Sequence, residues 1–174
     1  MNIAIVILAA GQGVRMKSSL PKVLHPLAGK PLIRHVLETA RQLTDQPPVV
    51  VIGHGGDQVQ AVVGNDGTCV RQEQQLGTAH AVMTARSLLA GTADLVLVMN
   101  SDMPLLTART LQSLVRAQAE NRGPISMLTL LSADSRGFGR VVRDGRGMVQ
   151  AIIEEAHATP EQLAIRELLS LIHI

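Results

Sequence analysis

Residues 3–22 read IAIVILAAGQGVRMKSSLPK, and the rest of the predicted fold is arranged around them. The aliphatic run at 3–8 does not alternate with polar residues, which is typical of a strand buried on both faces of a parallel sheet. It leads into a loop of small residues, 9–13, whose backbone N–H groups can approach an anion closely. Arg15 and Lys22 follow, and such cations bind phosphate oxygens. The pattern predicts a nucleoside triphosphate site after the first strand.

Two common phosphate-binding motifs fit this loop less well. Gly11 and Gly13 begin like the dinucleotide fingerprint G-x-G-x-x-G, but Met16 stands where the third glycine is needed. Met16 also replaces the second glycine of a P-loop that would end in Lys17 and Ser18. Both motifs are therefore disfavoured. The remaining alternative is a glycine-rich turn followed by ordinary surface charges.

The composition narrows the class of protein. The chain has 174 residues, 46% of them hydrophobic, and a formal net charge of +2, which fits one domain with a real core. Cys69 is the only cysteine and Phe138 the only aromatic residue. A lone cysteine fits the reducing cytoplasm, and the lack of aromatics disfavours single-stranded nucleic acid as a partner. No apolar run reaches the ~20 residues of a membrane span, and the N-terminus is interpreted as a strand, not a signal peptide.

Patterns of strands and helices alternate along the chain. Strands are predicted at 2–8, 49–52, 68–70, 94–99 and 125–131, and helices at 31–43, 57–63, 77–89 and 107–120. A hairpin follows, with strands at 140–143 and 148–153 that flank Asp144-Gly145, and Thr159 begins a last helix. This alternation predicts an α/β domain with a mostly parallel sheet flanked by helices. Ligands bind at the carboxyl ends of such strands, so the loops at 9–13 and 100–102 are expected on one rim.

Asp102 is the best candidate metal ligand. It follows a buried strand, and an exposed carboxylate there suits Mg²⁺, which prefers oxygen ligands and keeps several waters. The alternative is an aspartate that only caps a turn. The six histidines show no zinc spacing and no triad order, so they are interpreted as structural or surface residues. Cys69 is interpreted as a buried small hydrophobe.

The segment 8–16, LAAGQGVRM, followed by LPK at 20–22, resembles the signature of the sugar-nucleotide pyrophosphorylases. The longer stretch 8–36 is similar in particular to the N-terminal domain of the bacterial bifunctional N-acetylglucosamine-1-phosphate uridylyltransferases / glucosamine-1-phosphate acetyltransferases, and the likeness continues to about Glu167. The resemblance implies a Rossmann-like nucleotidyltransferase domain at 1–167, incomplete and truncated at its C-terminal end. Residues 168–174 are expected to be an atypical apolar tail that leaves an exposed patch.

The resemblance also implies roles for single residues. Arg15 and Lys22 are expected to be catalytic, and Asp102 to hold Mg²⁺. The segment 72–81, QEQQLGTAHA, resembles the family's nucleoside-binding segment, in which Gln72 and the backbone of Gly77 and Thr78 would read uracil. The full expected substrate-binding set is Leu8, Ala9, Ala10, Gly11, Gly13, Lys22, Gln72, Gly77, Thr78, Asn100, Ser101, Asp102, Gly139 and Glu154.

Three members of this set allow other interpretations, and two positions depart from the family pattern. Thr78 fits an ordinary helix cap, and Gly139 fits a hairpin glycine. Glu154 is expected to contact the acetamido sugar, although its neighbour Glu155 would fit equally. Two positions depart from the family: Ser101 replaces a glycine, and Leu169 stands where a sugar-contacting asparagine is expected.

The implied activity is transfer of UMP from UTP to N-acetylglucosamine 1-phosphate, giving UDP-N-acetylglucosamine and pyrophosphate for peptidoglycan and lipopolysaccharide synthesis. The parent protein is expected to be a cytoplasmic homotrimer through a second domain that is absent from these residues. Two alternatives remain. The chain could serve another sugar phosphate or cofactor precursor, or be a non-catalytic nucleotide-binding fragment.

Overall fold

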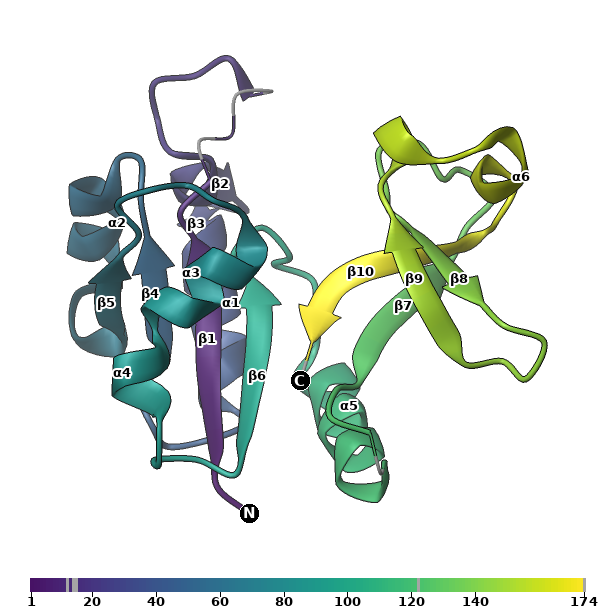
Figure 1. Ribbon diagram of the computed structural model, residues 1–174. Helices are drawn as coiled ribbons and strands as arrows, with labels where there is room; N and C mark the ends of the chain where they lie inside the picture. The colour runs from purple at the N-terminus through teal and green to yellow at the C-terminus, as the bar shows by residue number, and fades with distance from the viewer. Residues whose placement is uncertain (12, 14–15, 122, 174) are drawn as a thin grey trace.

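The first strand, β1 (Ile3–Ala9), lies inside a group of four parallel strands. The computed structural model of the chain describes residues 1–11, 13, 16–121 and 123–173, with side chains at the C-terminal end as far as Leu169. β1 pairs with β4 (Val49–Ile52) and with β6 (Leu95–Asn100), and β5 (Thr68–Arg71) follows β4. The order β5-β4-β1-β6 confirms the predicted parallel sheet, whose carboxyl ends share one edge (Figure 1).

Helices cover both faces of this parallel group (Figure 1). Alternate β1 side chains point to opposite faces, as in any strand. Ile5 and Ile7 pack with one layer of helices, and Ala4 and Val6 pack with the other. The first layer contains α1 (Leu32–Arg41), α2 (Gly56–Val63) and α5 (Ala108–Glu120), and the second contains α3 (Thr78–Thr84) and α4 (Arg86–Leu89).

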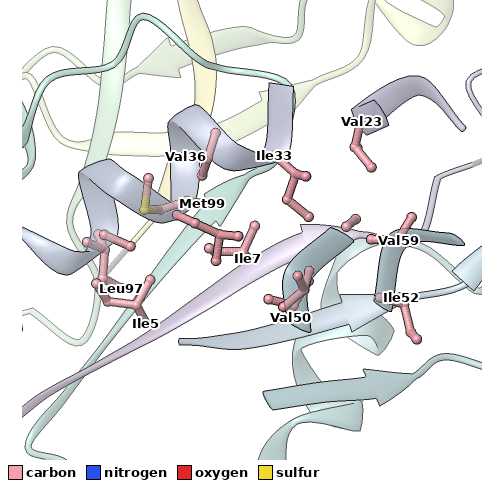
Figure 2. Packing of buried hydrophobic residues seen from close by; sticks show 14 of the residues in the cluster. Ile5, Ile7, Val23, Ile33, Val36, Val50, Ile52, Val59, Leu97 and Met99 are labelled. Atoms are coloured by element: carbon pink, nitrogen blue, oxygen red, sulfur yellow. The ribbon is translucent and has the colours of Figure 1, made fainter. Parts of the chain in front are cut away.

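The larger core cluster explains why these helices form where they do. In α1 the buried residues are Ile33, Val36, Leu37 and Ala40, a spacing that lines one helix face. Figure 2 shows Ile33 and Val36 above the side chains of the β1 and β6 strands. The partly buried Cys69 packs against the same cluster, as a small hydrophobe would.

A second group of strands extends the same eight-stranded sheet with antiparallel pairing. Its members are β7 (Met127–Leu131), β8 (Arg140–Arg143), β9 (Val149–Ile153) and β10 (Glu167–His173). β10 lies between β6 and β8 and also pairs with β7. Short elements complete the described chain: η2 (Lys22–Leu24), β2 (Pro26–Leu27), β3 (Lys30–Pro31), η3 (Gly64–Asp66), η4 (Glu155–His157) and α6 (Pro160–Leu163).

The expected apolar tail at 168–174 stays a prediction, but its first residues belong to a strand. β10 begins at Glu167 and continues through that boundary, so residues 167–173 form one strand. Leu168 pairs with Leu130 of β7, and both Leu168 and Leu169 are buried. Whether residues 1–167 are an incomplete domain stays a prediction.

Two local predictions were right in outline but not in detail. The predicted hairpin is confirmed by the antiparallel pairing of β8 with β9. The hairpin turn runs through Asp144–Met148, because the Asp144 carboxylate accepts hydrogen bonds from the N–H groups of Arg146 and Met148, and Gly147 takes the left-handed conformation. The predicted helix at 77–89 divides into α3 and α4 at Ala85. There Ala85 N–H bonds the carbonyl of Val82, a tighter turn than the α-helix uses.

The Thr107 cap was predicted correctly: its side chain accepts from Thr110 N–H at the start of α5. Thr159 likewise caps α6 with a complete capping box, in which Gln162 completes the reciprocal pair. None of the described helices is both long and apolar enough to span a bilayer.

We expect Leu97→Ala to lower the free energy of unfolding by about 3 kcal/mol, because Leu97 is fully buried in β6 and truncation leaves a cavity. Leu131→Ala is the matched control, since Leu131 is 82% exposed in β7. Its cost should stay within about 0.5 kcal/mol. Urea denaturation of both variants checks this, and equal losses would contradict the assigned core.

Glu167 gives a prediction that depends on pH. Its carboxylate accepts from Arg143 Nε at 2.7 Å and from Thr129 Oγ1 at 2.9 Å, so it ties β10 to β8 and β7. The hydrogen bond from Arg143 is the main reason why the pKa of Glu167 lies below its ordinary value. A lowered folded-state pKa stabilises the fold above the ordinary value, and this contribution is lost as the pH falls through the lowered pKa.

We therefore expect Glu167→Gln to reduce unfolding stability by about 1–2 kcal/mol at pH 7, where the wild-type carboxylate is charged. The difference should shrink steadily at pH values below the ordinary glutamate pKa. Urea titrations of wild type and variant between pH 7 and pH 3 measure it. A difference that is constant over this range would show that the charge contributes nothing.

Candidate active site

The loops that follow β1 and β6 are held together by one carbonyl group. Leu8 of β1 lies beside Asn100 of β6 in the parallel register. The carbonyl oxygen of Leu8 accepts from both Ser101 N–H at 3.1 Å and Ser101 Oγ at 2.6 Å. The hydroxyl that replaces the expected glycine is therefore bonded to the sheet, and Ser101 is buried. Asp102 follows directly at the rim of the sheet.

Lys22 reaches the same rim from the other loop. Val23 and Leu24 beside it are buried, which anchors η2 to the core and leaves Lys22 at the surface of the fold. Its Nζ donates to Asp102 Oδ2 at 2.5 Å, although the two residues are 80 positions apart. Each side chain is about one-third exposed, 37% for Lys22 and 32% for Asp102. A cation and a carboxylate thus face the same solvent-accessible space.

Gly13 allows the loop to pass close to Lys22. Its φ is +62°, in the left-handed region that favours glycine. A Cβ atom at this position would also lie 2.7 Å from the Cβ of Lys22, which is too close for any side chain. Glycine is therefore required at position 13 for steric reasons, which the sequence motif alone does not reveal.

A cleft of about 820 Å³ opens at this rim. All fourteen residues expected to bind substrate line it, whereas Arg15 lies outside the described residues. Their role in binding stays a prediction. The residues of one wall come from the parallel group and α3, and those of the other wall come from the β8–β9 region with its preceding loop. Figure 1 shows these two parts of the fold on opposite sides of the view. The described lining includes two cations, Lys22 and Arg136, and two carboxylates, Asp102 and Glu154.

The segment after β5 forms part of the first wall. Gln72 N–H donates to the carbonyl of Ile52 at 2.8 Å, and Gln75 Nε2 donates to the carbonyl of Ala10 at 3.0 Å. These bonds fix the segment against the ends of β4 and β1. Thr78 is not the helix cap, because α3 starts at Thr78 itself and Gly77 is the capping residue without a side-chain bond.

The opposite wall distinguishes two neighbouring glutamates. Glu154 lines the cleft next to Gly139, where an added Cβ would come within 3.6 Å of Glu154 Oε1. Glu155 instead accepts a hydrogen bond from Gly137 N–H. Glu155 therefore has a structural contact, and Glu154 is the carboxylate available to a ligand. Leu169, at the asparagine position, also lines the cleft.

Arg140 holds the loop that carries this wall. The residue is 2% exposed, and its guanidinium donates to the carbonyl of Phe138 and to Ser135 Oγ. Glu155 Oε1 lies 3.8 Å from Arg140 Nη2. A buried guanidinium with these partners fixes residues 135–138 over the cleft.

The described residues hold no cluster of three His, Cys, Asp or Glu side chains that could form a closed metal site. Asp102 offers one carboxylate, and the amide-bearing Asn100 lines the cleft nearby. Mg²⁺ is commonly bound by one or two carboxylates together with water and substrate phosphates. The residues therefore fit an ion that arrives with a phosphorylated ligand better than a preformed metal cage.

Several residues that line the cleft were not among the predicted site residues. Gln75 lies between Gln72 and Gly77, which are expected to read uracil, so its amide could have been assigned from the sequence. No sequence signal pointed to Arg136. It lies on a loop without a motif, and it pairs with Asp134 at 2.8 Å as an ordinary surface arginine would. The others are Met16, Val23, Ala81, Gly137 and Phe138, in addition to Leu169.

Comparison with known proteins gives the family. The sequence model of the MobA-like NTP transferase domain matches residues 5–137, more than half of the chain. The chain belongs to the MobA-like NTP transferase family. It is also 52% identical over 164 residues to the bifunctional protein GlmU of Ralstonia nicotianae, and 49% identical over 169 residues to that of Pseudomonas aeruginosa. These alignments cover 94% and 97% of the chain but only 35% and 36% of the relatives, so the chain spans about a third of their length.

Solved structures agree on the fold of this NTP transferase. A UDP-glucose pyrophosphorylase complexed with UDP-glucose matches with a TM-score of 0.72 and 17% identity, over 99% of this chain and 75% of that one. A CMP:2-keto-3-deoxy-manno-octonic acid synthetase complexed with CTP matches with a TM-score of 0.71 and 21% identity, over 99% and 73%. The predicted Rossmann-like nucleotidyltransferase fold is confirmed, and at these identities the likeness concerns the fold alone.

We expect Arg140→Leu to reduce unfolding stability by about 1–3 kcal/mol, because the Phe138 carbonyl loses its buried donor. Amide hydrogen exchange at Gly137–Gly139 should become faster as the loop loosens. Arg146→Leu, an exposed arginine in the β8–β9 turn, is the control and should change neither measurement. Unaltered exchange in Arg140→Leu would show that Arg140 does not fix this wall.

Proposed function

We propose that the cleft transfers UMP from UTP to N-acetylglucosamine 1-phosphate, releasing pyrophosphate and UDP-N-acetylglucosamine. The observation that carries this proposal is the meeting of Lys22 and Asp102 at 2.5 Å on the rim of a cleft lined by the fourteen expected binding residues. The uridine nucleotide and the acetamido sugar come from the sequence resemblance. The similarity to bifunctional GlmU proteins over nearly the whole chain supports the same choice.

In the proposed reaction a phosphate oxygen of the sugar phosphate attacks the α-phosphorus of UTP. A new P–O bond forms, the bond between the α-phosphorus and the bridging oxygen breaks, and pyrophosphate leaves with that electron pair. No protein nucleophile is needed, because the attacking phosphate is already anionic at neutral pH. The task of the protein is to position two anions in line and to offset their charge.

Lys22 is proposed to exchange its contact with Asp102 for oxygens of the triphosphate. Its ammonium then stabilises the charge that builds up on the phosphate oxygens during transfer. Asp102 would hold Mg²⁺, and the bound ion would neutralise further charge on the triphosphate. Arg15 is proposed to bind the triphosphate tail.

Each wall of the cleft is proposed to recognise a different part of the substrates. Gln72 and the backbone at Gly77 and Thr78 are proposed to face the uracil, on the wall built from the parallel group. Gly139 and Glu154, adjacent on the other wall, are proposed to contact the acetamido sugar. The proposal includes a cytoplasmic setting in precursor synthesis for the cell wall, and a parent protein that forms trimers through a region outside this chain.

We expect Lys22→Met and Asp102→Asn each to lower kcat for pyrophosphate release by at least about 100-fold, the usual loss when one charge-stabilising group is removed. The assay uses UTP, N-acetylglucosamine 1-phosphate and Mg²⁺. Both side chains are partly exposed, so thermal unfolding should change little.

Two matched substitutions control for nonspecific effects of charge. Lys30→Met removes a lysine that pairs with Glu38 of α1, and Asp57→Asn removes an aspartate whose side chain is 92% exposed. Both should retain wild-type turnover. Pyrophosphate release at the wild-type rate in Lys22→Met or Asp102→Asn would reject the proposed roles. A larger thermal shift with CTP or GTP than with UTP would favour another nucleotidyltransferase substrate.

A further inference from the structure

The side chain of Gln72 is buried in the wall of the cleft, with only 5% of the residue exposed. A glutamine amide has two N–H donors on Nε2 and one acceptor oxygen, Oε1. Nε2 lies 3.3 Å from the carbonyl oxygen of Gly77 and 2.8 Å from Nδ1 of His80 in α3. Both donors of the amide therefore have a partner within the protein.

The Gly77 carbonyl determines which way the amide faces. A carbonyl oxygen can only accept a hydrogen bond, so the amide must turn Nε2 toward it. Nε2 then donates its second hydrogen to His80, which requires Nδ1 without a proton. The neutral imidazole must carry its hydrogen on Nε2. These two hydrogen bonds together determine the orientation of the Gln72 amide and the tautomer of His80.

Oε1 is the remaining polar atom of Gln72, and none of the described residues donates a hydrogen bond to it. Because Gln72 lines the cleft, this oxygen is the atom that the amide can present to a ligand. We propose that His80 is a positioning residue that makes Gln72 a pure acceptor toward the base, and so selects bases with a ring N–H against bases with a bare ring nitrogen. The inference rests on the proposed function and deepens it.

Uracil and cytosine separate these two classes at nearly identical size. Uracil has a donor N–H at N3, which matches Oε1. Cytosine has an unprotonated acceptor at N3, so two lone pairs would face each other. A buried polar group left without a partner is costly, and this mismatch discriminates more strongly than shape alone.

His80 is held so that it can fulfil this role. Its backbone carbonyl accepts from Thr84 Oγ1 at 2.9 Å, one turn later in α3. The residue also lines a smaller surface pocket of about 280 Å³ with Arg71, Glu73, Gln74 and Thr84. The ring therefore bridges the buried amide and a solvent-accessible pocket where its Nε2 hydrogen can be hydrated.

The test measures UTP and CTP binding by isothermal titration calorimetry without sugar phosphate, so that no turnover occurs. Wild type should bind UTP more tightly than CTP. In His80→Leu the amide loses one of its two fixed acceptors, and the ratio of the two dissociation constants should fall roughly tenfold. His80→Asn keeps an acceptor near the position of Nδ1, and should restore most of the ratio. His157→Leu, the same change at an exposed histidine in η4, should leave it unaltered.

The outcomes separate this inference from the proposed function. If wild type binds CTP as tightly as UTP, the proposed uridine preference itself is wrong. If wild type prefers UTP and folded His80→Leu keeps the same ratio, only the role of His80 is overturned.

A measurement on wild type alone covers the case in which His80→Leu does not fold. The ¹⁵N NMR shifts of the His80 ring, recorded where the imidazole is neutral, should show the hydrogen on Nε2 and a bare Nδ1. A ring that carries its hydrogen on Nδ1 would contradict the inference, because that atom could not then accept from Gln72.

Discussion

The parallel register of β1 and β6 is the constraint on which the rest of the cleft depends. It places Leu8 beside Asn100, and the Leu8 carbonyl then accepts two hydrogen bonds from Ser101. These hydrogen bonds fix the positions of the ends of β1 and β6 relative to each other, and so the positions of the loops that follow them. Asp102 therefore stands opposite Lys22, a contact between residues that lie 80 positions apart. A slip of one residue in this register would turn alternate side chains to the other face and separate the two charges.

The two walls of the cleft come from different kinds of structure. The wall nearest β1 consists of loops at the ends of parallel strands, where binding groups are usual in α/β proteins. The other wall is the antiparallel β8–β9 hairpin together with the loop that precedes it, 135–138, which the buried Arg140 fixes. β10 joins the halves, and Leu169 N–H bonds the Gly139 carbonyl at 3.0 Å. The position of this wall relative to β1 thus depends on one connecting strand.

The sequence predicted the parallel half well because each strand there is a short run of buried aliphatic residues with a helix after it. It missed β10, because antiparallel partners such as Leu130 and Leu168 are distant in sequence and give no local signal. Most site residues were assigned through resemblance to a family, not from spacing. Contacts such as Gln72 with His80 require the fold, since the helix that carries His80 must first pack against β1.

In the proposed function, the contact between Lys22 and Asp102 would link two binding events that would otherwise be independent. An anion that engages the lysine releases the aspartate, and a cation that engages the aspartate releases the lysine. Each ligand then removes a competitor of the other. By thermodynamic reciprocity, whatever factor the anion adds to the affinity for the cation, the cation must add to the affinity for the anion. An ion pair between two ligand-binding side chains would thus make the binding of the anion and of the cation cooperative.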